Sequence, residues 1–194
     1  MKFSVMNKKE IDINDALACV KGGGTLVYPT DTIWGIGCDA TNFEAVENIL
    51  KLKGREAGKG FVVLMNSTEM VEYYTGALSP NVINYLLAER STTIVFENSN
   101  GIAKNVLAED GTLAIRIPQK EIPLSLISKL GFPIVSTSAN LSGDPFPQTF
   151  DQINTEVLSG ADYVLNLRSD GQGRSQPSRI VKVLKTNEIV VLRD

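Results

Sequence analysis

Apolar residues recur every three or four positions in several stretches of the chain, which is the spacing of amphipathic helices. Asp12, and either Thr41 or Asn42, are residue types that cap helix N-termini, and the glycines at 22–24 end the first helix. The second helix has its apolar stripe at Phe43, Val46, Ile49 and Leu50. The predicted helices span 12–20 and 42–52, begin at Ser67 and at Ser79-Pro80, and span 123–130 and 152–158.

Between the helices lie short runs of β-branched and aromatic residues, which predict strands. The run 61–65 is apolar throughout, so both faces of that strand should be covered. The alternation of helices and strands predicts an α/β fold. The predicted strands cover 25–28, 61–65, 92–96, 112–117, 132–135 and 163–167, and a closing hairpin joins 178–184 to 188–192.

The composition indicates one globular domain over residues 1–194. The chain is 43% hydrophobic, has a mean hydropathy near zero, and contains no linker-like stretch. No run approaches the roughly 18 apolar residues of a membrane span, and residues 1–9 contain no continuous apolar core. We therefore expect a soluble, cytoplasmic protein with no membrane partner. A net charge of −3 and a pI near 5.1 argue against nucleic-acid binding by the whole surface, but they permit a local basic groove.

The chain contains no histidine, which excludes Ser–His and Cys–His catalysis and every histidine-ligated metal site. Cys19 and Cys38 show no Cys-x-x-Cys spacing. We expect both cysteines to be reduced and buried, rather than a disulfide or a nucleophile.

A basic, glycine-spaced bend, Lys53-Gly54-Arg55-Glu56-Ala57-Gly58-Lys59-Gly60, lies between the second helix and the apolar strand. Arginine matches phosphate or carboxylate with a planar fork of donors, and glycine lets backbone N–H groups approach a ligand. The bend therefore has the residues of an anion site, although basic residues also favour helix ends. It is not a P-loop, because the spacing is short and Gly60 follows the lysine. Residues 35–40 match a dinucleotide fingerprint by letter only, since they do not directly follow a strand.

Polar side chains gather at the ends of two predicted strands. Pro29-Thr30-Asp31-Thr32 follows the strand 25–28, and Ser136-Thr137-Ser138-Ala139-Asn140-Leu141-Ser142-Gly143 follows the strand 132–135. Ligands of α/β proteins usually bind at such strand ends, although simple capped turns have the same composition. Arg116 lies between two isoleucines, so it faces a groove or an ionic partner, and we favour the groove.

These segments resemble the YrdC-like threonylcarbamoyl-AMP synthases over nearly the whole chain and in the family's order. The matching stretches are 28–37, Lys53-Gly54-Arg55 with Lys59, 115–118, 136–143, Pro177-Ser178 and Leu192-Arg193. The resemblance implies a single-domain, twisted mixed sheet with flanking helices and a basic concave face. It also implies an enzyme, a nucleotidyltransferase that makes threonylcarbamoyl-AMP and pyrophosphate from L-threonine, bicarbonate and ATP. That reaction is the first step towards N6-threonylcarbamoyladenosine at position 37 of certain tRNAs.

The resemblance also implies roles for individual residues. Lys53 and Arg55 would be catalytic. The ATP-binding residues would be Lys53, Arg55, Lys59, Thr93, Ser138, Asn140 and Arg193, and the threonine-binding residues Thr32, Trp34, Leu64, Arg116 and Ser178. Mg²⁺ would arrive with ATP, with no metal held by the protein, and threonylcarbamoyl-transfer proteins would act downstream. The basic face could also bind tRNA or double-stranded RNA.

Some positions depart from the family pattern, and two other functions stay open. Trp34 stands where tyrosine is usual, Leu64 where histidine is common, and Arg179 where threonine is usual. One alternative is a double-stranded RNA- or tRNA-binding protein without catalysis. The other is a YciO-like nucleotide-binding paralogue that does not make the adenylate.

Overall fold

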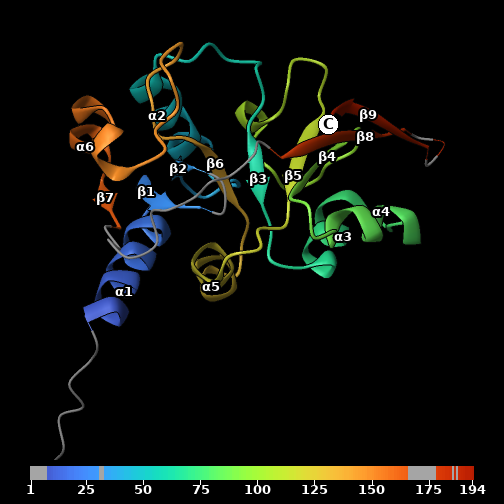
Figure 1. Ribbon diagram of the computed structural model, residues 1–194, viewed down its shortest axis with the longest axis horizontal. Helices are drawn as coiled ribbons and strands as arrows, with labels where there is room; N and C mark the ends of the chain where they lie inside the picture. Colours follow the sequence, from blue (N-terminus) through green and yellow to red (C-terminus); the bar gives the residue numbers. More distant parts are fainter. Residues whose placement is uncertain (1–7, 31–32, 166–177, 185, 187) are drawn as a thin grey trace, which may run out of the picture.

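The computed structural model describes residues 8–30, 33–165, 178–184, 186 and 188–194. In these residues nine strands form one mixed sheet in the order β7-β1-β2-β6-β3-β5-β4-β8-β9 (Figure 1). The strands are β1 (Leu26–Pro29), β2 (Trp34–Gly37), β3 (Val62–Leu64), β4 (Thr92–Phe96), β5 (Leu113–Arg116), β6 (Ile134–Ser138), β7 (Tyr163–Val164), β8 (Arg179–Val183) and β9 (Ile189–Arg193). The helices are α1 (Lys8–Lys21), α2 (Phe43–Lys53), α3 (Thr68–Thr75), α4 (Pro80–Leu86), α5 (Glu121–Leu130) and α6 (Thr155–Gly160), with short 3₁₀ turns η1 (Lys104–Val106) and η2 (Phe150–Gln152).

The sheet contains both parallel and antiparallel pairs, as expected for a mixed α/β fold. Strand pairs β1–β7, β3–β5 and β4–β8 are parallel, and the other five neighbouring pairs are antiparallel. The closing hairpin is confirmed as β8 and β9.

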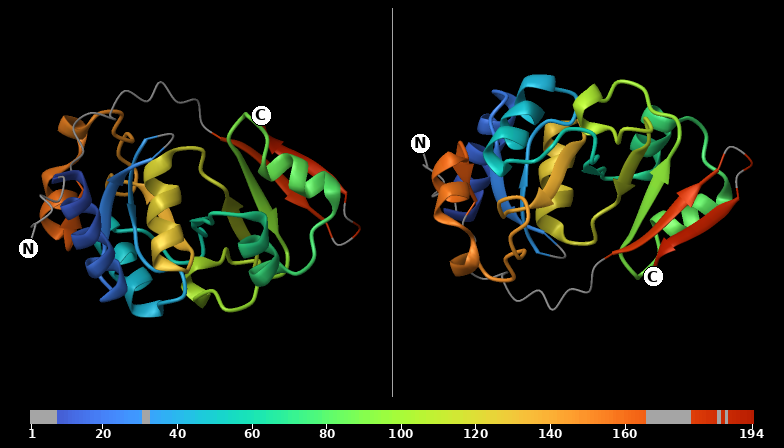
Figure 2. Two further views of the ribbon diagram at one scale, coloured as in Figure 1. Left: turned by 90° about the horizontal axis from the view of Figure 1, so that it is seen from below. Right: turned by 90° about the horizontal axis from the view of Figure 1, so that it is seen from above.

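Two hydrophobic clusters cover the two faces of the sheet. Successive residues of a strand point to opposite faces, and on β1 Val27 belongs to one cluster while Leu26 and Tyr28 belong to the other. Helices α1 and α5 supply the cluster that contains Leu26, and they contact each other on that side (Figure 2). We call this side of the sheet the α5 face. Helices α2, α3, α4 and α6 contribute to the cluster on the opposite face.

Local signals fix several helix ends as predicted. The Asn42 side chain caps α2 by accepting hydrogen bonds from the backbone N–H groups of Glu44 and Ala45, and Ser67 and Ser79 cap α3 and α4. Gly54 ends α2 with φ +57°, a left-handed conformation that suits glycine.

Several boundaries differ from the predictions. Helix α1 begins at Lys8, so Asp12 lies inside the helix rather than at its cap. Phe43 is 54% exposed because it lies at the solvent-facing start of α2, although the rest of the predicted stripe is buried. Strand β2 was not predicted, since its glycines masked the strand pattern. The predicted helix 152–158 begins only at Thr155, after the 3₁₀ turn η2.

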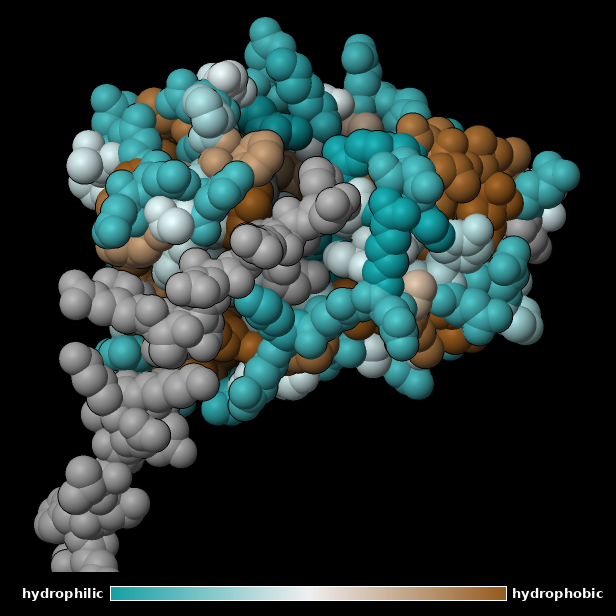
Figure 3. All heavy atoms as spheres, viewed as in Figure 1, coloured by the Kyte–Doolittle hydropathy of each residue, from teal (hydrophilic) through white to brown (hydrophobic). Residues whose placement is uncertain are grey.

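The two ends of the sheet are unlike each other. Strand β7 has two residues, whereas β9 has five and carries exposed Val190, Val191 and Leu192. These residues form part of the apolar surface at the β9 end of the molecule (Figure 3). Among the described residues, no helix is both long enough and apolar enough to cross a membrane.

Candidate active site

A cavity of about 410 Å³ lies on the α5 face of the sheet. Its strand residues alternate with buried core residues of the opposite face: Thr93 precedes Ile94 on β4, and Ile180 precedes Val181 on β8. The described lining residues are Thr30, Ile33, Gly35, Arg55, Gly60, Phe61, Val62, Thr93, Arg116, Ser136, Thr137, Ser138, Ser178, Ile180 and Arg193. They include three arginines and no acidic side chain, so the cavity suits an anionic ligand.

Strand register places two of these arginines in one row across the sheet. Ile180 on β8 is paired with Thr93 on β4 and with Arg193 on β9. On β5, Arg116 directly follows Ile115, the partner of Ile94, and so continues the row on the other side of Thr93. Arg116 is 6% exposed, and the expectation that it faces a groove agrees with its position at the cavity.

Arg55 enters the cavity from the basic bend. Its Nη2 donates to the carbonyl oxygen of Gly60 at 2.7 Å and to that of Lys59 at 3.2 Å, and its guanidinium carbon lies 4.9 Å from the centre of the Phe61 ring. Its Nε is buried without a hydrogen-bond partner among the described residues. Burial lowers the pKa of Arg55 from its ordinary value. The bend therefore fixes the Arg55 guanidinium group at the wall of the cavity.

The closed bend depends on Gly60, whose φ is +58°. A Cβ atom there would lie 3.1 Å from the Cβ of Ala108, which leaves little room for a side chain. The carbonyl group of Gly60 is the closer acceptor for Arg55. Glycine at this position thus helps to place the arginine.

Ser178 connects the cavity arginine of β9 to β4. The hydroxyl oxygens of Ser178 and Thr93 lie 2.9 Å apart, and Arg193 Nη2 donates to the Ser178 carbonyl oxygen at 2.8 Å. These contacts join the beginning of β8 to both of its neighbours. They hold two hydroxyl groups and one guanidinium group at the same side of the cavity.

The polar cluster after residue 135 begins inside a strand rather than in a loop. Strand β6 continues to Ser138, because Ser136 pairs with Val62 and Ser138 pairs with Gly35. Ser136 and Ser138 are two residues apart, so both face the cavity. The predicted turn begins only after Ser138.

Lys53 was expected to contact the nucleotide, but it does not line the cavity. Its side chain is 3% exposed, and Nζ donates to the carbonyl oxygens of Ser138 and Asn140. Burial, followed by the nearby positive charge of Arg55, lowers the pKa of Lys53 to about 8.

Three more expected site residues lie away from the cavity lining. Trp34 is on the opposite face of β2 from Gly35, where its ring packs edge-on against Phe150 at 5.2 Å. Leu64 shares the face of the cavity but is fully buried in the cluster under α5. Lys59 is 57% exposed and pairs with Glu56 at 3.0 Å. Trp34 and Leu64, which were expected to bind threonine, therefore do not line the cavity.

Asn140 lines a neighbouring cavity of about 590 Å³ instead. Its Nδ2 donates to the carbonyl oxygen of Asp144 at 2.6 Å. The lining residues are Asn140, Asp144, Pro145, Phe146, Pro147, Gln148, Gln152 and Asn154. Ser138 lines the first cavity and Asn140 the second, so the segment 138–140 contributes one residue to each cavity.

Other expectations have separate outcomes. Thr32 lies outside the described residues. Cys38 is buried as predicted, whereas Cys19 is only partly buried, and both are free thiols. No group of three His, Cys, Asp or Glu side chains among the described residues is arranged to hold a metal ion.

Several residues that line the cavity were not among the predicted ATP-binding or threonine-binding residues. They include Thr30, Gly35 and Ser136. The Thr30 hydroxyl donates to the Ile33 carbonyl oxygen at 2.6 Å, which joins two of the described lining residues to each other. An i, i+2 pattern of Ser136 and Ser138 in a strand would have indicated one common face.

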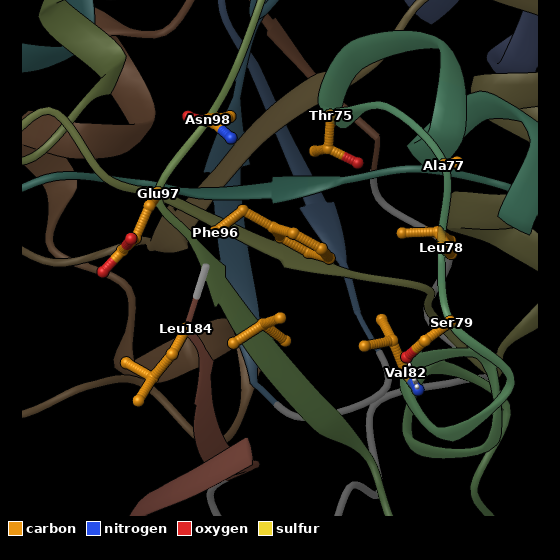
Figure 4. A pocket seen from close by; sticks show the side chains of 10 residues that line it. Thr75, Ala77, Leu78, Ser79, Val82, Phe96, Glu97, Asn98 and Leu184 are labelled. Atoms are coloured by element: carbon orange, nitrogen blue, oxygen red, sulfur yellow. Dashed lines mark hydrogen bonds between the residues drawn. The ribbon is translucent and has the colours of Figure 1, made fainter. Parts of the chain in front are cut away.

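A third hollow, of about 120 Å³, lies between the α3–α4 connection and the ends of β4 and β8. The Phe96 ring points toward Leu78 and Val82 there (Figure 4). Its one acidic group, Glu97, is paired with Lys182 at 3.5 Å. This hollow is small and lacks the arginines of the first cavity.

Comparisons with known proteins agree with the fold and the matched motifs. Residues 18–194 match the Sua5/YciO/YrdC family, which carries the description "Telomere recombination". A threonylcarbamoyl-AMP synthase from Saccharophagus degradans is 33% identical over 174 residues, which are 87% of each chain. Another from Coxiella burnetii is 31% identical over 135 residues, 69% of this chain and 73% of that protein.

The solved structure of P. abyssi Sua5 complexed with L-threonine has a TM-score of 0.81 and 27% identity to this chain. The match covers 93% of this chain and 53% of that one, so the chain spans about half the length of Sua5. The family match covers most of the present sequence. The chain therefore belongs to the Sua5/YciO/YrdC family.

Proposed function

We propose that the chain is a threonylcarbamoyl-AMP synthase, which makes threonylcarbamoyl-AMP and pyrophosphate from L-threonine, bicarbonate and ATP. The observation that carries the proposal is the cavity with three arginines and no acidic residue in its described lining. A triphosphate and an amino-acid carboxylate are both anions that arginine binds well. The relatives that bear this enzyme name match most of the chain.

The reaction suits a chain without histidine. The amine of threonine combines with bicarbonate to give a carbamate and water. A carbamate oxygen then forms a bond to the α-phosphorus of ATP, and the bond to the departing pyrophosphate breaks. No protein nucleophile is required, so positioning and cations at the developing negative charge can supply the catalysis.

The resemblance to the YrdC-like family implies a division of the first cavity between its two ligands. Arg55, Arg193 and Ser138 would bind the triphosphate, with Thr93 beside them. Arg116 would bind the threonine carboxylate, and Ser178 the threonine hydroxyl. Thr32 keeps its proposed place in the threonine site.

The second cavity would receive the adenosine. Amide side chains such as that of Asn140 can pair with the edge of adenine, and an exposed aromatic ring such as Phe146 can stack on a base. Segment 138–140 would then lie between the phosphates and the nucleoside. Mg²⁺ would enter with ATP as part of the substrate, because magnesium commonly binds substrate phosphates.

In the cell, the product would supply the threonylcarbamoyl group for adenosine 37 of tRNA through downstream transfer proteins. We expect this in the cytoplasm, where tRNA is modified, and contact of tRNA with the arginine-bearing side of the sheet is part of the same proposal.

The test is pyrophosphate release from ATP with L-threonine and bicarbonate, compared with reactions in which threonine or bicarbonate is omitted. We expect release only with all three substrates, and much less from Arg55→Met. ATP binding without pyrophosphate release would favour a YciO-like paralogue. ATP-independent RNA binding with a steep salt dependence and no pyrophosphate would favour the non-catalytic RNA-binding protein.

A further inference from the structure

Lys53 ties the end of α2 to the segment that follows β6. Its backbone carbonyl oxygen accepts a hydrogen bond from the N–H group of Ser142 at 2.8 Å. Its side-chain Nζ donates to the carbonyl oxygens of Ser138 and Asn140. Main chain and side chain thus hold the same short segment, at positions 138, 140 and 142.

The donors of the Lys53 ammonium group are all accounted for within the chain. A lysine ammonium group has three N–H donors. Two meet the carbonyl oxygens of Ser138 and Asn140, and the third has the Asn140 side-chain Oδ1 at 3.4 Å. With the side chain 3% exposed, no donor remains for a phosphate group unless this arrangement breaks.

Arg55, two residues after Lys53, differs from it in position and in hydrogen bonding. It lines the cavity, and its Nε has no hydrogen-bond partner among the described residues. The two neighbouring cations of the basic bend are therefore not equivalent. Lys53 is fully engaged by the protein, whereas Arg55 lines the cavity.

The segment held by Lys53 contributes Ser138 to the first cavity and Asn140 to the second. The Ser138 carbonyl oxygen also accepts from the Asn140 N–H group at 2.9 Å, which makes a tight turn between the two residues. Ala139 between them donates its N–H to the Trp34 carbonyl oxygen at 2.9 Å. Moving this turn would displace Ser138 in one cavity and Asn140 in the other.

We propose that Lys53 is a positioning residue that holds the Ser138–Asn140 turn through its backbone carbonyl groups, instead of binding a phosphate of the nucleotide. This inference rests on the proposed function for its consequence, since the turn would present Ser138 and Asn140 to ATP. We call this set of hydrogen bonds from Lys53 to the Ser138–Asn140 turn the clamp. It is present in the protein without any ligand.

The first experiment measures backbone hydrogen exchange in the ligand-free protein, for Lys53→Met beside the matched variant Arg55→Met. We expect exchange of the Asn140 and Ser142 amides to be at least about tenfold faster in Lys53→Met and unchanged in Arg55→Met, because hydrogen bonds to a charged donor are strong. Unchanged exchange in Lys53→Met would overturn the clamp. This result does not depend on ATP binding or on catalysis.

The second experiment separates positioning from general stability by using steady-state kinetics. In folded Lys53→Met the KM for ATP should rise at least about tenfold and more than the KM for threonine. The effects of Lys53→Met and Ser138→Ala on the KM for ATP should be less than additive, because both changes act through the same turn. An unchanged KM for ATP, or additive effects of Lys53→Met and Ser138→Ala, would overturn the positioning role.

If Lys53→Met does not fold, the exchange experiment is done with Lys53→Gln instead. The glutamine amide can still donate a hydrogen bond to one of the two carbonyl groups. Its Asn140 and Ser142 amides should exchange faster than in the wild type, and equal rates would overturn the clamp. Failure of both variants to fold beside a folded Arg55→Met would support the structural role. If the wild-type protein released no pyrophosphate, the proposed function would fail while the exchange result still decided the clamp.

Discussion

Leu64 and Arg116 are register partners on the parallel strands β3 and β5, yet the edge of the candidate active site passes between them. Leu64 is fully buried under α5, whereas Arg116 lines the cavity. Both side chains share one face of the sheet because cross-strand partners do. On this face of the sheet, one register partner therefore belongs to the hydrophobic core and the other to the cavity lining.

Arg55→Ala should lower kcat/KM by at least about tenfold and leave the fold intact. The loss of one charge-assisted contact to a phosphate is worth roughly 1.5–3 kcal/mol, and about 1.4 kcal/mol corresponds to a factor of ten. Lys51→Ala is the control, because Lys51 is an exposed residue of the same helix end. Steady-state pyrophosphate assays measure both, and equal rates for Arg55→Ala and the wild type would remove Arg55 from the active site.

Gly35→Val and Trp34→Phe should have different effects, although the residues are adjacent. A valine at position 35 would project into the cavity beside Thr30 and Ser136, so the KM values for the substrates should rise severalfold. Trp34→Phe removes buried packing against Phe150 and should lower the free energy of unfolding by less than the roughly 3–5 kcal/mol of full truncation, with KM unchanged. Denaturant titration and kinetics distinguish them. The reverse pattern would show that Trp34 faces the ligand.

The stability contributed by Lys53 should depend on pH. The pKa of Lys53 is lowered to about 8 in the fold from its ordinary value of 10.5, because burial and the positive charge of Arg55 disfavour the charged form. The unfolded chain therefore binds more protons between these values, and the free energy of unfolding rises with pH across that window. Relative to Lys53→Met, the wild type should gain on the order of 3 kcal/mol from pH 8 to 10.5. Urea titrations at several pH values measure this, and a constant difference would contradict the lowered pKa.

The selectivity for threonine should depend more on the groups that bind its hydroxyl than on those that contact its methyl group. Serine lacks one methyl group of threonine, and a missing methyl in an apolar pocket costs only about 10–200-fold. Valine lacks the hydroxyl, and an unmet buried hydrogen bond can cost about 10⁴-fold. At matched concentrations serine should be a poor substrate and valine nearly inert. A higher rate with valine than with serine would show that Ser178 and Thr32 do not bind the hydroxyl.

The sequence predicts helix ends and most strands because these depend on local chemistry. Asn42 and Gly54 act at the two ends of α2 through their own side chain and backbone. Strand β2 escapes prediction because two of its four residues are glycine, and its pairing with β1 and β6 stabilises it instead.

The residues that line the cavity could be predicted only in part. Whether a strand residue lines the cavity depends on which face of the strand is left uncovered by helices. Arg55, Arg116 and Ser138 carry the chemistry of an anion site in their sequence context, and all three line the cavity. The opposite orientations of Trp34 and Gly35 follow from strand β2, which was not predicted. The engagement of Lys53 by distant carbonyl groups has no local sequence signal.

The most direct test of the account follows the carbon of bicarbonate into the product. The protein is incubated with ATP, L-threonine and ¹³C-bicarbonate, and the nucleotide products are separated and weighed by mass spectrometry. We predict an adenylate that contains threonine and carries the label, formed in equal amount with pyrophosphate and lost when threonine is omitted. Cleavage of ATP without a labelled threonine adenylate would contradict the assignment of threonylcarbamoyl-AMP synthesis to this cavity.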